Sequence, residues 1–395
     1  MKAVICGAGI AGLALAQRLG TMGWDIVVLE KAPGPRAQGY MIDFFGAGYD
    51  AAEAMGILPR LEQLGHHVDE ATYVDGTGRR RVGFSYAALA RAARGGLVSI
   101  MRPDLERVLR EQLPARVDLR FATSVRHVAS LPGGVRLSLT DGSRLDADLL
   151  AGADGIHSKV RELVFGDERR WLRFLGFHTA AFSFDDPEVH AEVQGRFCLT
   201  DTVGRLVGVY GFGDGRVGAF TVHRTGVPAL PADAQAAVRR VYGSLGWIVP
   251  RVLAACPPSA DVYYDQVAQI VMPRWSQGRV TLVGDACQAV SLLAGQGASL
   301  GIGGAYVLAE QLALAGSIEA GLDRYECMWH PVIRYKQRVA RIMANWFLPE
   351  SLLRLRARRL ALRLACLPGL DQYVATSLVG KPTMIVRELN TARLG

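Results

Sequence analysis

The chain has 395 residues, of which half are hydrophobic and 21% are charged, and its formal net charge is +8. This composition excludes a disordered chain, and the lack of any run of about 18 apolar residues argues against a transmembrane segment. The basic residues are mostly arginine without a nucleic-acid-binding motif, and none of the six cysteines has C-x-x-C spacing, so no nucleic acid partner and no metal site are predicted.

The first predicted elements are a strand, a glycine-rich turn, a helix and a second strand. Residues 2–6 are apolar, and residues 25–30 form a second apolar run that ends in Glu30. Between them, three glycines follow the spacing G-x-G-x-x-G: Gly7, Gly9 and Gly12. The first allows a tight turn, the second lets the backbone approach a pyrophosphate, and the third lets helix and strand pack closely. Glu30 can accept hydrogen bonds from ribose hydroxyls, so the segment predicts a dinucleotide site for either FAD or NAD.

Two later segments have the same order of strand, acidic residue and turn. Residues 149–161 predict a strand, a sharp turn with Asp154 and a helix start, and residues 278–301 predict a strand that ends at Asp285. A glycine-rich loop and a long helix over 298–315 follow. The N terminus of such a helix has unpaired N–H groups and a positive dipole, so it suits a developing anion such as the pyrimidine edge of a reduced flavin.

Together, the three motifs resemble the G-x-G-x-x-G, DG and GD fingerprints of the FAD-dependent class A flavoprotein monooxygenases, which have the para-hydroxybenzoate hydroxylase fold. Residues 36–43 and 102–109 are similar to further segments of that family, the first of them to a segment of tetracycline-inactivating monooxygenases. The resemblance covers about residues 1–345. It implies an α/β fold with a Rossmann-like FAD-binding domain, an inserted antiparallel-sheet substrate domain and C-terminal helices.

The resemblance also implies roles for single residues at matching positions. Arg102 would reach the pyrophosphate or ribityl region, Asp285 a ribityl hydroxyl, and the backbone at Val125 the adenine. For Asp154 and Asp43, a helix cap and a turn respectively stay open as structural alternatives. The complete set of implied cofactor-binding residues is Gly7, Gly9, Ala11, Gly12, Glu30, Lys31, Arg36, Asp43, Arg102, Val125, Asp154, Asp285, Gly295, Gly297 and Ala298.

The expected domains are discontinuous in sequence. The FAD-binding domain is predicted over 1–70, 98–170 and 275–345, the substrate domain over 71–97 and 171–274, and a C-terminal helical segment over 346–395. Alternating strands over 172–225 favour an antiparallel sheet. Residues 351–365 have leucines and arginines at helical spacing, and a docked helix, an oligomer contact and a membrane-surface helix stay open for them.

The substrate pocket is expected between this sheet and the loop after the third motif. Four residues are candidates for catalysis, with packing as the alternative for the first two: Tyr210, His223, Gln288 and Ser291. Further residues predicted to line the pocket are Gln38, Tyr40, Phe182 and Phe212. Three positions depart from the family pattern: Gln288 where His is usual, Leu292 where Pro is usual, and Cys287, which we interpret as a packed thiol.

The activity that the resemblance implies is hydroxylation of an electron-rich aromatic or polyketide-like small molecule. NADPH or NADH, bound transiently because no second G-x-G-x-x-G exists, would reduce FAD, and O2 would then add at C4a to form a hydroperoxide. Arg36 stands where relatives use an arginine for NADPH. Two alternatives stay open: a flavin-dependent halogenase, although its W-x-W-x-I-P motif is missing, and an FAD-scaffolded non-redox cyclase or binding protein. A cytoplasmic location and a possible homodimer complete the prediction.

Overall fold

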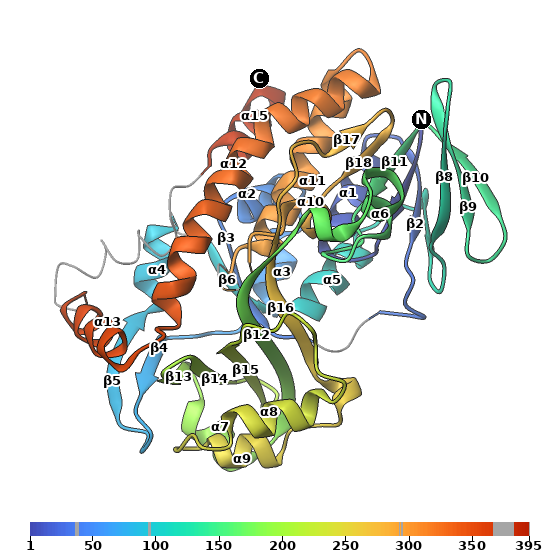
Figure 1. The fold of residues 1–395 in the computed structure, drawn as a ribbon. Coiled ribbons are helices and arrows are strands. Elements are labelled where there is room, and N and C mark those ends of the chain that lie inside the picture. The colour runs from blue at the N-terminus through green and yellow to red at the C-terminus, as the bar shows by residue number, and fades with distance from the viewer. Residues whose placement is uncertain (36–38, 94–95, 292, 294, 366–382, 395) are drawn as a thin grey trace.

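The computed structural model describes residues 1–35, 39–93, 96–291, 293, 295–365 and 383–394. Two main sheets form its two halves, one above the other in Figure 1. The long helix α12 (Ile318–Phe347) runs between these halves and includes Pro331 within its length. The fold is the α/β architecture that the sequence motifs predict.

The first sheet, within the described residues, has five parallel strands and one antiparallel edge strand. In spatial order its strands are β17 (Ser276–Gln277), β18 (Val280–Leu282), β11 (Leu149–Gly152), β1 (Lys2–Cys6), β2 (Asp25–Leu29) and β7 (Val117–Arg120). The central strands β1 and β11 are almost entirely buried, which explains their continuous apolar sequence. Helices α1 (Ile10–Thr21) and α11 (Gly297–Leu314) pack against each other in this half.

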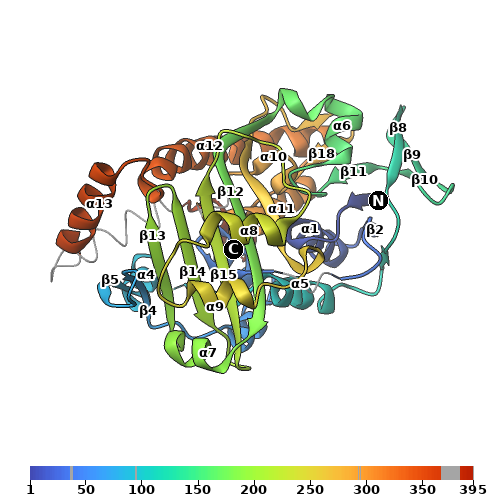
Figure 2. The same cartoon turned by 60° about the horizontal axis from the view of Figure 1, so that its bottom comes forward.

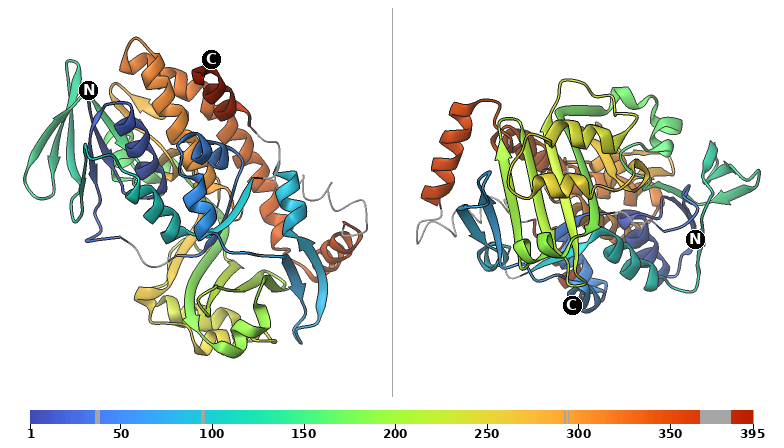
Figure 3. Two further views of the ribbon diagram at one scale, coloured as in Figure 1. Left: turned by 180° about the vertical axis from the view of Figure 1, so that it is seen from behind. Right: turned by 90° about the horizontal axis from the view of Figure 1, so that it is seen from below.

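Smaller elements complete this half. Strands β3 (Met41–Phe45) and β6 (Leu97–Met101) form an antiparallel pair beside helices α2 (Ala47–Ala54), α3 (Leu58–Leu64) and α5 (Arg102–Glu111). After β11 and β18 come α6 (Lys159–Phe165), the 3-10 helix η1 (Glu168–Arg170) and α10 (Asp285–Gln288). The antiparallel strands β8 (Val125–Leu131), β9 (Gly134–Leu139) and β10 (Arg144–Ala147) project at the end of the molecule opposite α13 (Leu352–Ala365), as Figures 2 and 3 show.

The second sheet is formed by two separate parts of the chain. In spatial order its described strands are β16 (Tyr263–Ile270), β12 (Leu172–Asp185), β15 (Arg216–Arg224), β14 (Arg205–Gly211), β13 (Arg196–Thr202), β4 (Glu70–Val74) and β5 (Arg80–Ser85). Its pairs are antiparallel except for β4 with β13. Helices α7 (Pro187–Val193), α8 (Ala234–Tyr242) and α9 (Val249–Ala254) cover one face (Figure 2), the short η2 (Ser259–Asp261) precedes β16, and α4 (Tyr86–Ala92) follows β5.

The C-terminal helices are held to the rest of the chain by arginines. Arg358 and Arg359 of α13 both pair with the buried carboxylate of Asp201 on β13, the latter at 2.6 Å. Helix α15 (Ile385–Leu394) packs on α2 and α11, and its Arg387 pairs with Asp50 at 2.7 Å. Part of the C-terminal positive charge therefore forms ion pairs that hold these helices to the rest of the chain. Among the described residues, none of the helices has the length and apolar character needed to span a bilayer.

Candidate functional site

A cavity of about 840 Å³ begins at the carboxyl ends of four neighbouring parallel strands. Its lining includes residues at or within three positions of the ends of these strands: Gly7 after β1, Glu30 after β2, Asp154 after β11 and Asp285 after β18. Open parallel sheets bind their ligands at this edge, because the loops that leave the strands meet there. The cavity continues beneath the second sheet toward α12 and α13.

The glycine turn after β1 is packed so closely that two of its positions admit no side chain. Gly7 has a φ of +107°, and a Cβ atom there would lie 2.4 Å from the carbonyl oxygen of Ala153. A Cβ atom at Gly12 would lie 1.9 Å from the carbonyl oxygen of Gly7. Gly9 lines the cavity just before α1, whose N terminus has no side-chain cap. The unpaired N–H groups and the dipole of α1 therefore face the cavity and suit a pyrophosphate.

Glu30 and Arg102 bring opposite charges to this end of the cavity. The carboxylate of Glu30 accepts hydrogen bonds from the N–H groups of Ala8 at 3.0 Å and Ala32 at 2.9 Å, which fixes its orientation. It keeps further acceptor capacity for ribose hydroxyls. Arg102, at the start of α5, pairs with Glu106 at 2.7 Å, and both side chains line the cavity.

Asp285 lies where the third motif meets the cavity. Its side chain is accessible from the cavity but is otherwise enclosed by protein, and this burial raises its pKa, while the nearby Arg102 opposes the rise. Helix α11 begins close by at Gly297, also without a side-chain cap, and Gly295, Gly297 and Ala298 line the same space. A dinucleotide carrying a flavin fits this set, because one helix N terminus can face its pyrophosphate and the other its pyrimidine edge.

Asp154 both caps a helix and lines the cavity. Its Oδ2 accepts hydrogen bonds from the N–H groups of Lys159 at 2.7 Å and Val160 at 3.1 Å, so it caps the start of α6. Its Oδ1 is buried and has no hydrogen-bond partner among the described residues, and Asp154 also lines the cavity. Because a buried acceptor without a partner is costly, a donor from a bound ligand is expected there.

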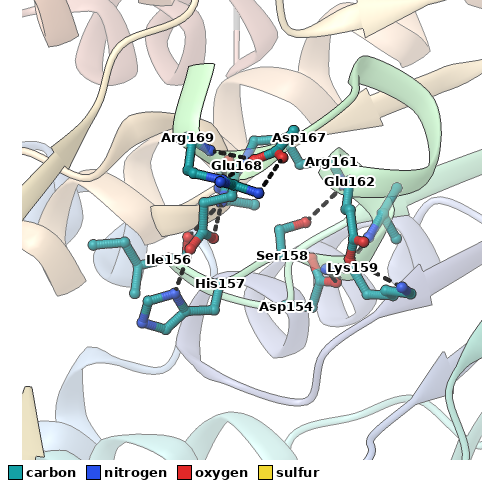
Figure 4. Close-up of polar contacts among 12 residues, drawn as sticks. Asp154, Ile156, His157, Ser158, Lys159, Arg161, Glu162, Asp167, Glu168 and Arg169 are labelled. Carbon is teal, nitrogen blue, oxygen red and sulfur yellow. Dashed lines mark hydrogen bonds and ion pairs between the residues drawn. The ribbon is translucent and has the colours of Figure 1, made fainter. Parts of the chain in front are cut away.

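Arg161 connects the second motif to the third (Figure 4). Its side chain is fully buried, and it donates hydrogen bonds to the carbonyl oxygens of Ile156 at 2.7 Å and Ala286 at 2.8 Å. It also pairs with Glu168 at 2.5 Å. Since Ala286 follows Asp285 in α10, this one guanidinium fixes the position of both acidic motifs relative to each other.

The imidazole of His157 lies between two carboxylates. Its Nδ1 is 2.9 Å from Oε1 of Glu168, and its Nε2 is 3.7 Å from Oδ1 of Asp265 on β16. Asp265 has the largest effect on the pKa of His157, which rises to about 9 with the help of Glu168 and against the effect of burial. Protonated His157 therefore connects the turn after β11 with the second sheet.

His157→Gln is expected to lower the melting temperature at acidic and neutral pH but not above about pH 9. The folded-state pKa is raised to about 9, so the stabilisation is complete below the unfolded-state pKa of about 6.5 and is lost as pH rises through the folded-state value. Solvent screening of this half-exposed side chain keeps the effect below about 1 kcal/mol. Thermal unfolding from about pH 5 to about pH 10 measures it, and a pH-independent difference would contradict the assignment.

The far part of the cavity is an apolar chamber. We define the chamber by six apolar side chains, of which four belong to the second sheet and two to α12: Tyr73, Phe84, Phe197, Phe220, Met343 and Phe347. Near it, the Tyr210 hydroxyl accepts a hydrogen bond from the Met41 N–H at 2.8 Å. Asp43 accepts hydrogen bonds from the hydroxyls of Ser99 at 2.7 Å and Tyr86 at 3.1 Å, and its burial raises its pKa.

Most of the predicted site residues line this one cavity. They are Gly7, Gly9, Ala11, Glu30, Lys31, Tyr40, Asp43, Arg102, Asp154, Tyr210, Asp285, Ser291, Gly295, Gly297 and Ala298. Ser291 has a φ of +115°, an uncommon backbone conformation for a residue with a side chain. Arg36, Gln38 and Leu292 lie outside the described residues.

Two catalytic candidates do not line the cavity, contrary to expectation. The buried amide of Gln288 donates to the Tyr325 hydroxyl and accepts from the Trp329 ring nitrogen at 3.3 Å, so its polar atoms are used to hold α12. His223 lies on the face of β15 opposite Phe220, because side chains alternate along a strand. There its Nδ1 is 3.0 Å from the Tyr242 hydroxyl, and burial lowers its pKa to about 4.

Four other predicted residues have packing positions. Gly12 lies against the Gly7 backbone, and the Val125 side chain is buried in the core, while the adjacent Ser124 lines the cavity. Phe182 packs in the core beneath α7 to α9, and Phe212 packs beside Tyr210, so neither lines the cavity as expected. The Cys287 thiol is buried, and burial raises its pKa, which agrees with a packed, unreactive thiol.

Residues of α12 that were not predicted also line the cavity: Lys336, Met343 and Phe347. Arg358 of α13 lines it as well, which agrees with the docked helix that was one of the three interpretations of residues 351–365. The only signal for them in the sequence was helical periodicity, which shows that a helix has a buried face but not what that face contacts.

Comparisons with known proteins agree with the site. Residues 1–339 match the FAD binding domain family. The chain is 31% identical over 370 residues to the FAD-dependent monooxygenase asL6 of Sarocladium schorii, and this alignment covers 86% of each of the two chains. Its fold is similar to that of the tetracycline destructase Tet(51), with 25% identity, a TM-score of 0.79 and coverage of 97% of this chain and 99% of that one. A variant of Klebsiella pneumoniae HpxO, complexed with FAD, has 25% identity and a TM-score of 0.82 over 96% and 99% of the two chains.

Proposed function

Because this chain belongs to the FAD binding domain family of flavin-dependent monooxygenases, we propose that it hydroxylates an aromatic or polyketide-like small molecule with NAD(P)H and O2. The observation that carries this proposal is the continuity of the cavity, which joins the glycine turn after β1 to the apolar chamber. A dinucleotide at the turn and a substrate in the chamber would share one continuous space, in which the bound molecules would help to exclude water from the reaction.

The residues proposed to hold FAD are those whose backbone or side chain faces the turn end of the cavity. The N terminus of α1 would bind the pyrophosphate with Arg102, Glu30 the ribose, and Asp285 a ribityl hydroxyl. The N terminus of α11 would face the pyrimidine edge. When bound, FAD supplies hydride acceptance from the nicotinamide and the activation of O2.

The substrate class is proposed from the lining of the chamber. Aromatic and aliphatic side chains dominate it, and such surfaces bind planar apolar rings by burial and stacking. The tetracycline destructase with a similar fold is named for a polycyclic substrate, which supports a polycyclic aromatic or polyketide-like compound here. Tyr210 would help to shape the pocket, because its hydroxyl is held by the Met41 N–H.

Anaerobic mixing of the FAD-loaded protein with NADPH or NADH is expected to bleach the flavin absorbance, faster when a polycyclic phenol is present. Admission of O2 should then restore the absorbance and yield a product one oxygen atom heavier. Mass spectrometry with labelled O2 measures that gain. If neither nicotinamide bleaches the flavin with any of a panel of phenols, the proposed activity is wrong. A chlorinated product formed only with added halide would instead indicate a halogenase.

A further inference from the structure

Helix α12 presents a lysine to the cavity. Lys336 shares a helix face with Val339, Ala340 and Met343, and all four line the cavity. Met343, one of the residues that define the apolar chamber, is seven residues further along, about two helical turns. Lys336 is half-buried and lines the cavity. A lysine in such a position can pack its four-carbon stem along the helix and direct its ammonium group toward the cavity.

The ammonium of Lys336 has no hydrogen-bond or ion-pair partner among the described residues, and this distinguishes it from two arginines that line the same cavity, Arg102 and Arg358. Arg102 is paired with Glu106, and Arg358 with the buried carboxylate of Asp201. Burial lowers the pKa of Lys336 to about 8, and no carboxylate of the described residues offsets this effect. A desolvated cation without a counter-charge is costly, and an anion that enters the cavity removes that cost.

We propose that Lys336 binds an ionised oxygen of the substrate, either a ring-attached carboxylate or a phenolate, and thereby selects acidic aromatic substrates. The inference rests on the proposed function only in taking the chamber as the substrate site. An ionised phenol is also more electron-rich than its neutral form, which suits a ring that is to be hydroxylated. Lys336 would act as a specificity-determining residue that orients the ring within the chamber.

Paired naphthalene probes test this subsite with the FAD-loaded protein. Equilibrium dialysis at neutral pH would compare 2-naphthoate with the neutral 2-naphthamide, and 2-naphthol with 2-methoxynaphthalene. The wild type is expected to prefer the acidic member of at least one pair by about tenfold, the effect of one charge-assisted hydrogen bond. Preference within the first pair identifies a carboxylate ligand. Preference within the second identifies a phenolate if the bound 2-naphthol also shows the red-shifted absorbance of its ionised form.

Substitutions at Lys336 separate charge from shape. Lys336→Met should lose the preference while its affinity for the neutral probes stays within about twofold, and Lys336→Arg should retain most of the preference. Arg338→Met is the matched control, because Arg338 is exposed on the same helix and its loss changes net charge equally. If Lys336→Met loses FAD or unfolds, Lys336→Gln is measured in its place.

The outcomes distinguish this inference from the proposed function. A wild type that does not discriminate within either pair, or a Lys336→Met protein that discriminates like the wild type, overturns the anion subsite even if NADPH still bleaches the flavin. If the preference depends on Lys336 but no nicotinamide reduces the flavin, the subsite stands and the proposed activity fails.

Discussion

The Gly12→Ala protein is expected to be purified with little bound FAD and to be less stable than the wild type by about 3 kcal/mol. A Cβ atom at this position would lie 1.9 Å from the carbonyl oxygen of Gly7 and 3.2 Å from Cβ of Ala153. Because the nearest obstacle is backbone, it cannot rotate away, and the turn between β1 and α1 must open. Flavin absorbance per chain and chemical unfolding measure the two effects.

Gly316→Ala is the matched control for this prediction. Gly316 lies between α11 and α12, and apart from its chain neighbours no atom of the described residues lies within 4 Å of the position that its Cβ would take. The same chemical change should therefore leave the FAD content unaltered and the free energy of unfolding within about 0.5 kcal/mol of the wild type. If Gly12→Ala behaved like this control, close packing of the turn would not be the feature that maintains the site.

The Arg161→Met protein is expected to lose about 3 kcal/mol of stability and to release FAD faster than the wild type. The substitution removes a fully buried guanidinium that bonds two backbone carbonyl oxygens, those of Ile156 and Ala286, and one carboxylate, that of Glu168. These carbonyls belong to the loops of Asp154 and Asp285, so both acidic residues lose their fixed separation. Chemical unfolding gives the stability, and flavin fluorescence after dilution gives the release rate.

Arg169→Met controls for the loss of charge in the same region (Figure 4). Arg169 pairs with Asp167 at 3.1 Å, but its side chain is 92% exposed, so its removal should change stability by less than about 1 kcal/mol. It should also leave the release of FAD unchanged. Equal effects of the two substitutions would show that general charge, and not the buried bridge, accounts for the result.

The dinucleotide end of the site could be located from the sequence because its signals are local. Gly7 and Glu30 lie within one strand–turn–helix–strand unit. The spacing of the unit predicts the role of each, a tight turn at Gly7 and hydrogen bonds to a ribose at Glu30. Asp154 and Asp285 follow strands of the same parallel sheet, so the geometry of that sheet brings them to one edge. Family resemblance added Arg102 and the start of α11, which line the same cavity.

Polar residues close to the motifs were harder to place. Gln288 stands only three residues after Asp285, but its amide is used in contacts with α12, an element that begins about thirty residues later. His223 and Phe220 share β15 but lie on opposite faces, and the face that meets the cavity depends on which side α8 covers. Neither fact is encoded by residue type or by spacing.

The residues that form the chamber could not be predicted from local sequence patterns. Its walls come from β4, β5, β13, β15 and α12, segments that meet only when β4 pairs with β13 and α12 packs across the junction of the two sheets. Sequence periodicity shows that α12 has a buried face but not what that face borders. In the sequence, Lys336 therefore resembles an ordinary surface lysine. Only the packed chain places it at the wall of the cavity, without a counter-charge among the residues that the structure describes. Short-range spacing determines a turn and its ligand, whereas long-range packing determines which side chains surround the substrate.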